Sequence, residues 1–315
     1  MRKRRFVRGE CNHVYQRTVE GFNIFYDRAD YLLCLMVLSV TAKSHGVRLI
    51  MICFMVDHIH ILVETESCEK MADFVRDYSS VFVHEYNVRL ERKGQLFYKS
   101  FGSAPKKGDK KTRSAIVYIG NNPVEKLLCV HPESYRWNLI AYMDKSYPFS
   151  LKPESKKMSR PLKRALGVVK AAVAAGRYVN SRVLELILSP LGGNDLEYFT
   201  DYVVSSYFPI DRDGLLEYYD DFMQMRMAMR SSTGSDYDIH ERFTPGSDMI
   251  YAEMADVVSR MGIHPVGRVT VMDMGKKMKV GSEIRKAMPW VKEYQLRKFL
   301  HIKNGDTHHV DNHVV

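Results

Sequence analysis

Two histidines separated by a single residue are the first feature of the sequence that suggests chemistry. His58 and His60 lie in an apolar stretch, residues 50–63, that is typical of β-strands. Because side chains alternate across a strand, both imidazoles are expected on one face, where they can bind one metal ion. The spacing alone is weak evidence, because the chain has 12 histidines in 315 residues. About half of all chains of this composition would contain an H-x-H by chance. Two partly exposed strand histidines without a ligand are the alternative.

A tyrosine and an asparagine later in the chain can complete a site for phosphodiester chemistry. Tyr118 and Asn122 lie four residues apart in a predicted helix, residues 114–122, and therefore project from one face of it. A phenolate is a moderate nucleophile, which needs a divalent cation such as Mg2+ or Mn2+ to polarise the phosphate. The amide oxygen of Asn122 would be a third ligand beside His58 and His60. The alternative for Tyr118 is a buried aromatic residue of an amphipathic helix.

The segments around these residues predict an α+β fold. Strands are expected at 13–19 and 47–56, in the histidine-bearing segment with its apolar run 59–63, and at 95–104. Helices are expected from the N-cap Asp27 to Gly46 and at 68–93. This order is that of a ferredoxin-like (RRM-like) antiparallel sheet with helices on one face. The other face would be open, so that the helix at 114–122 can bring Tyr118 over the two strand histidines. A break or kink is expected at Pro123.

The composition favours a nucleic-acid-binding protein of two domains. The formal net charge is +10, which favours a polyanionic partner. The five cysteines are odd in number, widely spaced and without a C-x-x-C pair, as expected for reduced thiols in a cytoplasm. No apolar run approaches the roughly 20 residues that cross a bilayer. We therefore expect neither a membrane span nor a signal peptide.

Basic residues near the predicted site are candidates for holding the DNA backbone. They are Arg17, Lys106, Lys107, Lys110, Lys111, Arg113 and Arg136. Five of them lie in a predicted loop, residues 105–113, directly before the helix that carries the tyrosine, although a solvated surface is the alternative. Tyr135 or Trp137 is a candidate for stacking on a base.

Four sequence blocks between residues 10 and 145 carry a family resemblance. They are HVYQRTVEGFNIFYDRADYLL, LIMICFMVDHIHILVE, MADFVRDYSSVFVHEYN followed by GQLFYKSFGSAP, and YIGNNPVEKLLCVHPESYRWN. In this order they resemble the REP-associated tyrosine transposases, which are relatives of the insertion-sequence transposases within the HUH nuclease superfamily. Because four ordered blocks are involved, the resemblance is far more specific than the H-x-H spacing.

The resemblance implies cleavage and joining of single-stranded DNA at hairpin elements, without ATP. The intermediate would be a 5'-phosphotyrosine that leaves a free 3'-OH. By position, the resemblance implies that His58 and His60 bind the metal, that Tyr118 is the nucleophile and that Asn122 is the third ligand. Asp57 stands where many relatives have asparagine or glutamate, and residues 126–128 stand where a glycine-bearing turn is usual. Neither departure changes the four functional positions.

The second half of the chain predicts helices and no catalytic motif. We expect a nuclease domain at 1–148, a linker at 149–162, a helical accessory domain at 163–305 and a disordered tail at 306–315. The helices are predicted at 163–175, 184–188, 196–207, 215–229, 249–261, 282–288 and 294–300. The last three can form a helix-turn-helix that presents Gln295, Arg297 and Lys298 to DNA, with a plain helical bundle as the alternative.

Two other functions stay open at this point. One is a relaxase or rolling-circle replication initiator with similar chemistry, which the compact size and the block order disfavour. The other is a non-catalytic regulator that binds nucleic acid on an RRM-like sheet. The sequence does not distinguish a monomer from a homodimer, in which a tyrosine can act on the metal site of the other subunit.

Overall fold

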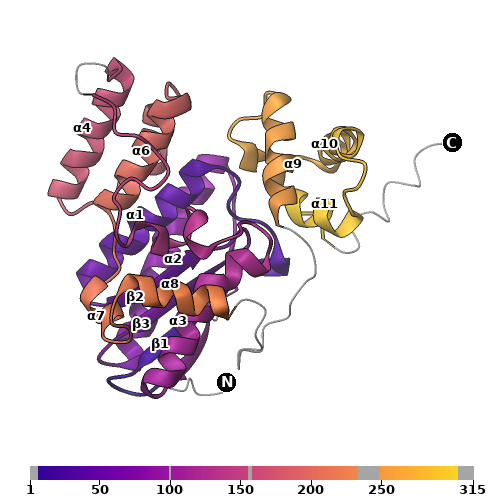
Figure 1. Cartoon of the computed structure of the whole chain (residues 1–315). Helices are drawn as coiled ribbons and strands as arrows, with labels where there is room; N and C mark the ends of the chain where they lie inside the picture. The colour runs from indigo at the N-terminus through magenta and orange to yellow at the C-terminus, as the bar shows by residue number, and fades with distance from the viewer. Residues whose placement is uncertain (1–5, 99–100, 155–157, 233–247, 304–315) are drawn as a thin grey trace.

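Four β-strands form one antiparallel sheet in the N-terminal half of the chain. The computed structural model describes residues 6–98, 101–154, 158–232 and 248–303 (Figure 1). The strands are β1 Cys11–Arg17, β2 Arg48–Phe54, β3 His58–Glu64 and β4 Gly102–Lys106. Their spatial order is β2-β3-β1-β4, and each neighbouring pair is antiparallel. This is the ferredoxin-like order, so the predicted α+β fold is confirmed.

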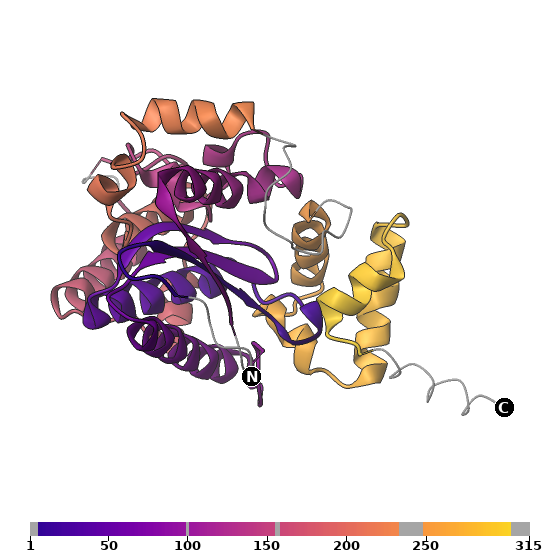
Figure 2. The same ribbon diagram turned by 90° about the horizontal axis from the view of Figure 1, so that it is seen from below.

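Helices lie on both faces of this sheet. The two crossover helices, α1 (Arg28–His45) and α2 (Cys68–Leu90), pack against each other on one face. On the opposite face lies α3 (Gly108–Glu125), and α8 (Phe222–Ser231) packs on the outside of α3 (Figure 2). The face that the sequence predicts to be open is therefore covered, and side chains that point from the strands toward α3 are largely buried.

Local capping residues determine both ends of α1. The carboxylate of Asp27 accepts hydrogen bonds from the backbone N–H groups of Ala29 and Asp30, at 3.0 and 3.3 Å. Asp30 bonds back to the N-cap, which completes a capping box. Gly46 ends the helix with a φ of 58°, a left-handed conformation that glycine adopts without steric cost. Both predicted ends are confirmed.

The prediction for α3 is wrong at both ends. The helix begins at Gly108, inside the stretch predicted as a basic loop, and continues through Pro123 to Glu125. Lysine and arginine are good helix formers, and Asp109 in the first turn suits the positive end of the helix dipole. Pro123 does not end the helix, because in the last turn its missing N–H removes a single hydrogen bond.

Five helices that follow share the hydrophobic core of the sheet. They are α4 Arg160–Ala174, α5 Ser181–Leu188, α6 Gly193–Ser206, α7 Arg212–Leu216 and α8. Buried side chains such as Leu162, Phe199 and Met225 belong to the same apolar cluster as those of β2 and β3. The single helix predicted at 215–229 is two helices, because Asp221 caps a new one by accepting from the N–H of Gln224. The domain boundaries at 148 and 162 stay a prediction.

The last three helices form a second apolar cluster. They are α9 Met249–Arg260, α10 Met274–Ala287 and α11 Glu293–Leu300, with a 3-10 helix at Val266–Val271 between the first two. They lie together at the right of Figure 1. Tyr26 and Val56 of the sheet region are part of this cluster, so it is docked on the rest of the chain. The tail predicted at 306–315 lies outside the described residues. Among the helices of the described residues, none is long and apolar enough to span a membrane.

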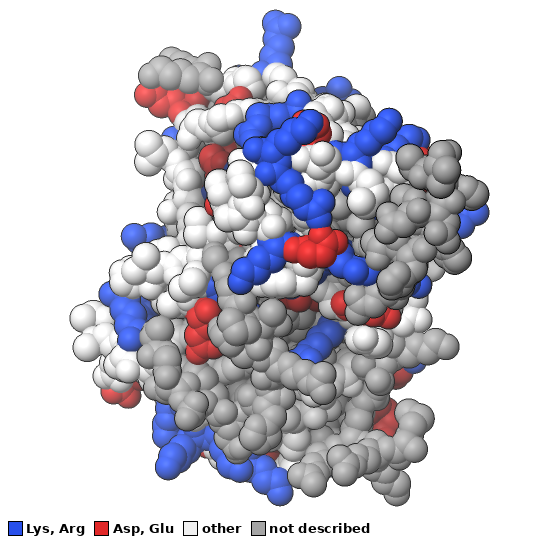
Figure 3. All heavy atoms as spheres, turned by 90° about the vertical axis from the view of Figure 1, so that its right-hand side faces the viewer, with Lys and Arg blue, Asp and Glu red and all other residues white. Residues whose placement is uncertain are grey.

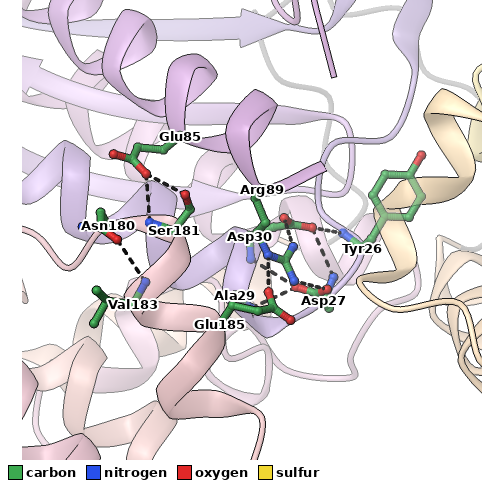
Figure 4. Close-up of polar contacts among 10 residues, drawn as sticks. All are labelled: Tyr26, Asp27, Ala29, Asp30, Glu85, Arg89, Asn180, Ser181, Val183 and Glu185. Carbon is green, nitrogen blue, oxygen red and sulfur yellow. Dashed lines mark hydrogen bonds and ion pairs between the residues drawn. The ribbon is translucent and has the colours of Figure 1, made fainter. Parts of the chain in front are cut away.

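An ion network buried between α1, α2 and α5 connects the layers (Figure 4). The guanidinium of Arg89 donates to Asp27 and Asp30 of the α1 cap at 2.6 Å each, and to Glu185 of α5 at 2.8 Å. The side chains of Arg89 and Asp30 are 3% and 0% exposed. One turn earlier on α2, Glu85 accepts from the backbone N–H and the hydroxyl of Ser181. These contacts attach α5 to both crossover helices.

Replacing Arg89 by methionine should lower the free energy of unfolding by about 3–5 kcal/mol, because Asp30 is left buried without its counter-charge. Urea denaturation followed by circular dichroism measures the change. Arg76→Met is the control, since Arg76 lies on the exposed side of the same helix, and its denaturation midpoint should equal that of the wild type. An unchanged midpoint for Arg89→Met would show that Asp30 does not need Arg89 as its counter-charge.

His301 ends α11 in a partly buried position against the segment before α1. Its Nε2–H donates to the carbonyl of Asn23 at 2.7 Å, and its ring stacks on Phe22 with centroids 4.5 Å apart. Burial lowers the pKa of His301 to about 3, so the ring is neutral in the folded protein. In the unfolded chain, His301 becomes protonated as the pH falls below about 6.5, whereas the folded chain binds this proton only at much lower pH. Acid therefore favours the unfolded chain, and stability is lost below about pH 6.5.

We expect the wild type to lose about 2 kcal/mol more stability than His301→Gln when the pH is lowered from 7.5 to 5.0. Urea denaturation at the two pH values measures this difference. His84 is exposed on α2, so His84→Gln should keep the pH dependence of the wild type. Equal losses in the wild type and in His301→Gln would show that this proton is not linked to folding.

Candidate functional site

A tyrosine ring and three imidazoles meet between the sheet and α3. The rings of His58 and His60 on β3 have centroids 4.7 Å apart. The ring of Tyr118 lies edge-on to His60, with centroids 5.7 Å apart. The structure therefore brings together the two histidines and the tyrosine that the sequence singles out. Tyr118 is 6% exposed, so its ring is buried beside the imidazoles, as the alternative of a buried aromatic residue also predicts.

The third imidazole is His13 on β1, which the sequence analysis missed. Its Nε2 lies 3.0 Å from Nδ1 of His60, and its ring centroid is 5.9 Å from that of Tyr118. Burial first, and then His60, Lys106 and His58, lower the pKa of His13 well below its usual value, so the ring is neutral. A signal was present, because the alternation in HVYQR places His13, Tyr15 and Arg17 on one strand face.

Tyr15 lies between His60 and the edge strand. It stands opposite His60 in the β1–β3 register and opposite Gly102 in the β1–β4 register. A Cβ atom at position 102 would fall 1.9 Å from the Tyr15 ring. Only glycine allows β4 to pass this close to the ring, which holds Tyr15 beside the imidazoles.

His58 is held from its Nδ1 side by the preceding residue. Asp57 Oδ1 lies 2.5 Å from His58 Nδ1, and Asp57 Oδ2 lies 2.8 Å from Nζ of Lys298 on α11. Burial raises the pKa of Asp57, but Lys298 and His58 together outweigh it and hold this pKa well below its usual value. Asp57 is therefore a carboxylate that bridges a site histidine and the last helix.

The donor set fits a divalent cation only in part. The Nε2 atom of His58 is buried and has no hydrogen-bond partner among the described residues, as expected of a ligand nitrogen. The amide nitrogen of Asn122 donates to the carbonyl of Tyr118 at 3.3 Å, so the carbonyl end of this amide is the ligand end. In the described ranges, no three His, Cys, Asp or Glu side chains are grouped to hold a metal. The remaining ligands would have to come from DNA or water.

The predicted basic residues fall into two groups. Lys107, Lys110, Lys111 and Arg113 are exposed at the start of α3, where they are available to phosphates. Lys106 is buried, and the guanidinium of Arg17 lies over the Tyr15 ring, 5.7 Å from its centroid. On the side of α9–α11, Lys and Arg cover more of the described surface than Asp and Glu (Figure 3).

Three predicted DNA contacts are engaged inside the protein instead. Arg136 pairs with Glu197 at 2.5 Å and with Asp201 at 3.3 Å. Trp137 stacks on Tyr31 with centroids 4.2 Å apart, and the hydroxyl of Tyr135 donates to the carbonyl of Phe54. These side chains have structural partners, which lie on α6 for Arg136, on α1 for Trp137 and on β2 for Tyr135.

The helix that was predicted to read DNA faces the protein. On α11, Lys298 pairs with Asp57, and Gln295 is buried, with its side-chain oxygen accepting from the N–H of Lys292. Arg297 donates to the carbonyl of Lys303. The face with Gln295 and Lys298 is therefore not displayed to a DNA groove, and it contributes to docking.

Comparison with known proteins identifies the segment that carries the site. Residues 13–122 match the family described as Transposase IS200 like. We refer to this matching segment, residues 13–122, as the transposase domain. It begins at His13 and ends at Asn122, so it contains every site residue described above except Lys298. The transposase domain occupies the sheet, its crossover helices and most of α3.

Other comparisons add less. No curated protein that was compared with the chain matches it. A solved structure of a REP-associated tyrosine transposase bound to a REP hairpin is 12% identical, with a TM-score of 0.39, and the match covers 44% of this chain and 81% of that chain.

The contact between His13 and His60 should contribute measurably to the stability of the transposase domain. Replacing His13 by leucine leaves a buried ring nitrogen of His60 without this partner, which we expect to cost about 1–3 kcal/mol. His13→Gln, which can still hydrogen-bond, should cost less. Urea denaturation of the two variants measures the difference, and equal stability of His13→Leu and the wild type would show that this contact contributes nothing.

Proposed function

We propose that the transposase domain cleaves and rejoins single-stranded DNA through a 5'-phosphotyrosine at Tyr118. The observation that supports this proposal is the position of the Tyr118 ring, 5.7 Å from the ring of His60 and within the same buried group as His58 and His13. A phenol beside two imidazoles on a rigid strand is the arrangement that metal-assisted attack on a phosphodiester requires.

Each side chain has a defined part in this reaction. The Tyr118 oxygen attacks the phosphorus after its proton passes to solvent, the bond from phosphorus to the 3'-oxygen breaks, and the 3'-oxygen leaves as a hydroxyl after taking up a proton. His58, His60 and the amide oxygen of Asn122 would hold Mg2+ or Mn2+. When bound, this cation stabilises negative charge on the phosphate oxygens. Attack of a second 3'-hydroxyl on the phosphotyrosine reverses the step and rejoins DNA.

The surface around α3 supports a nucleic-acid substrate. Lys107, Lys110, Lys111 and Arg113 are exposed at the N-terminal end of the helix that carries Tyr118. Their charges can hold backbone phosphates, and the helix dipole adds to them. The proposal that the substrate is a hairpin, as in REP-associated tyrosine transposases, rests on the sequence resemblance of the four blocks.

The proposal is tested by trapping the protein–DNA adduct. The full chain is incubated with a labelled single-stranded hairpin oligonucleotide and Mn2+, denatured in detergent and examined for label on the protein. Tyr118→Phe should lose the adduct and keep its affinity for DNA, because only the nucleophilic oxygen is removed. Tyr98→Phe, at a half-exposed tyrosine of the same domain, should form the adduct normally. His58→Ala should lose most of it.

Two results would count against this function. A Tyr118→Phe protein that still forms the adduct would show that another residue is the nucleophile. A wild-type protein that binds the oligonucleotide with either Mg2+ or Mn2+ but never forms an adduct would favour the non-catalytic binding function, in which the sheet domain only holds nucleic acid.

A further inference from the structure

A chain of three charged or polar side chains connects the last helix to the transposase site. Nζ of Lys298 lies 2.8 Å from Asp57 Oδ2, and the other oxygen of the same carboxylate lies 2.5 Å from His58 Nδ1. The side chains of Lys298, Asp57 and His58 are 21%, 19% and 13% exposed. The contact is thus largely shielded from water, where a charged hydrogen bond is stronger and more directional.

Several contacts fix the position of Lys298. Its backbone carbonyl accepts from the N–H of Asn23 at 3.3 Å, and its Nζ lies 4.9 Å from the centroid of the Tyr251 ring on α9. The hydroxyl of Tyr26 donates to the carbonyl of the next residue, Phe299, at 2.5 Å. The lysine is therefore held by the sheet region on one side and by α9 on the other, so its ammonium group is presented to Asp57 in a defined place.

We infer that Lys298 is a positioning residue of the transposase site, through which docking of α9–α11 orients His58 toward a bound cation. This inference rests on the function proposed above. A histidine that binds a metal through one ring nitrogen commonly donates its other N–H to a carboxylate, which fixes the orientation of the ring. Asp57 is that carboxylate. Because its second oxygen is held by Lys298, the carboxylate cannot rotate away without breaking an ion pair.

The same interface contains a second ion pair, more exposed than the first, that lacks this connection. Arg268, in the 3-10 helix between α9 and α10, pairs with Glu91 at the end of α2. This pair also joins the last three helices to the transposase domain, but the structure shows no contact between it and His58, His60, Tyr118 or Asn122. Loss of Arg268 therefore tests docking alone, whereas loss of Lys298 tests docking together with the orientation of Asp57.

The test is Mn2+ binding by the full chain without DNA, measured as the electron paramagnetic resonance signal of free Mn2+. Lys298→Met should raise the Kd for Mn2+ about tenfold, and Lys298→Arg, which retains the charge, should restore most of the affinity. Arg268→Met should bind Mn2+ as the wild type does. Asp57→Asn should weaken binding by itself, and combining it with Lys298→Met should add little, because both residues act through one contact.

The outcomes separate this inference from the proposed function. Wild-type affinity in Lys298→Met, or an equal loss in Arg268→Met, would overturn the role of Lys298 and leave the proposed function standing. If Lys298→Met does not fold, Asp57→Asn decides, since unchanged Mn2+ binding in that variant overturns the inference equally. A wild-type chain that neither binds Mn2+ nor forms the DNA adduct overturns the proposed function and the inference together.

Discussion

The antiparallel pairing of β1 with β3 is the constraint on which the rest of the site depends. It places Tyr15 directly opposite His60 and brings His13 within hydrogen-bond distance of the same imidazole. Side chains alternate along each strand, so a slip of one residue would turn His13, His58 or His60 toward the α1–α2 face of the sheet. Both strands have a neighbour on each side, and this fully paired position makes such a slip costly.

The two faces of the sheet differ in how their buried charges are compensated. On the α1–α2 side, charge is buried as a compensated network, in which the guanidinium of Arg89 contacts three carboxylates. On the α3 side, His13 is kept neutral by burial, and the charge of Asp57 is balanced by Lys298. A neutral His13 adds no positive charge that would oppose a cation bound beside His58 and His60.

Much of this arrangement follows from the sequence, where local signals are strong. Capping residues such as Asp27 and Gly46 mark helix ends by their own chemistry, and alternation in the strands predicts that His58 and His60 share a face. The position of Tyr118 near them follows from the order of the elements. What the sequence does not show is pairing at a distance, so neither the contact of His13 with His60 nor that of Lys298 with Asp57 could be predicted. The same limit explains why Arg136 and Trp137 were interpreted as DNA contacts although their partners lie in the protein.

The contact between Asp57 and Lys298 can form only late in the synthesis of the chain. A ribosome makes the chain from its N-terminus, so the whole transposase domain leaves the exit tunnel before Lys298 has been added to the chain. During this interval Asp57 lacks its ammonium partner. A chain that ends before residue 298 would contain His13, His58, His60 and Tyr118 but lack the lysine that pairs with Asp57.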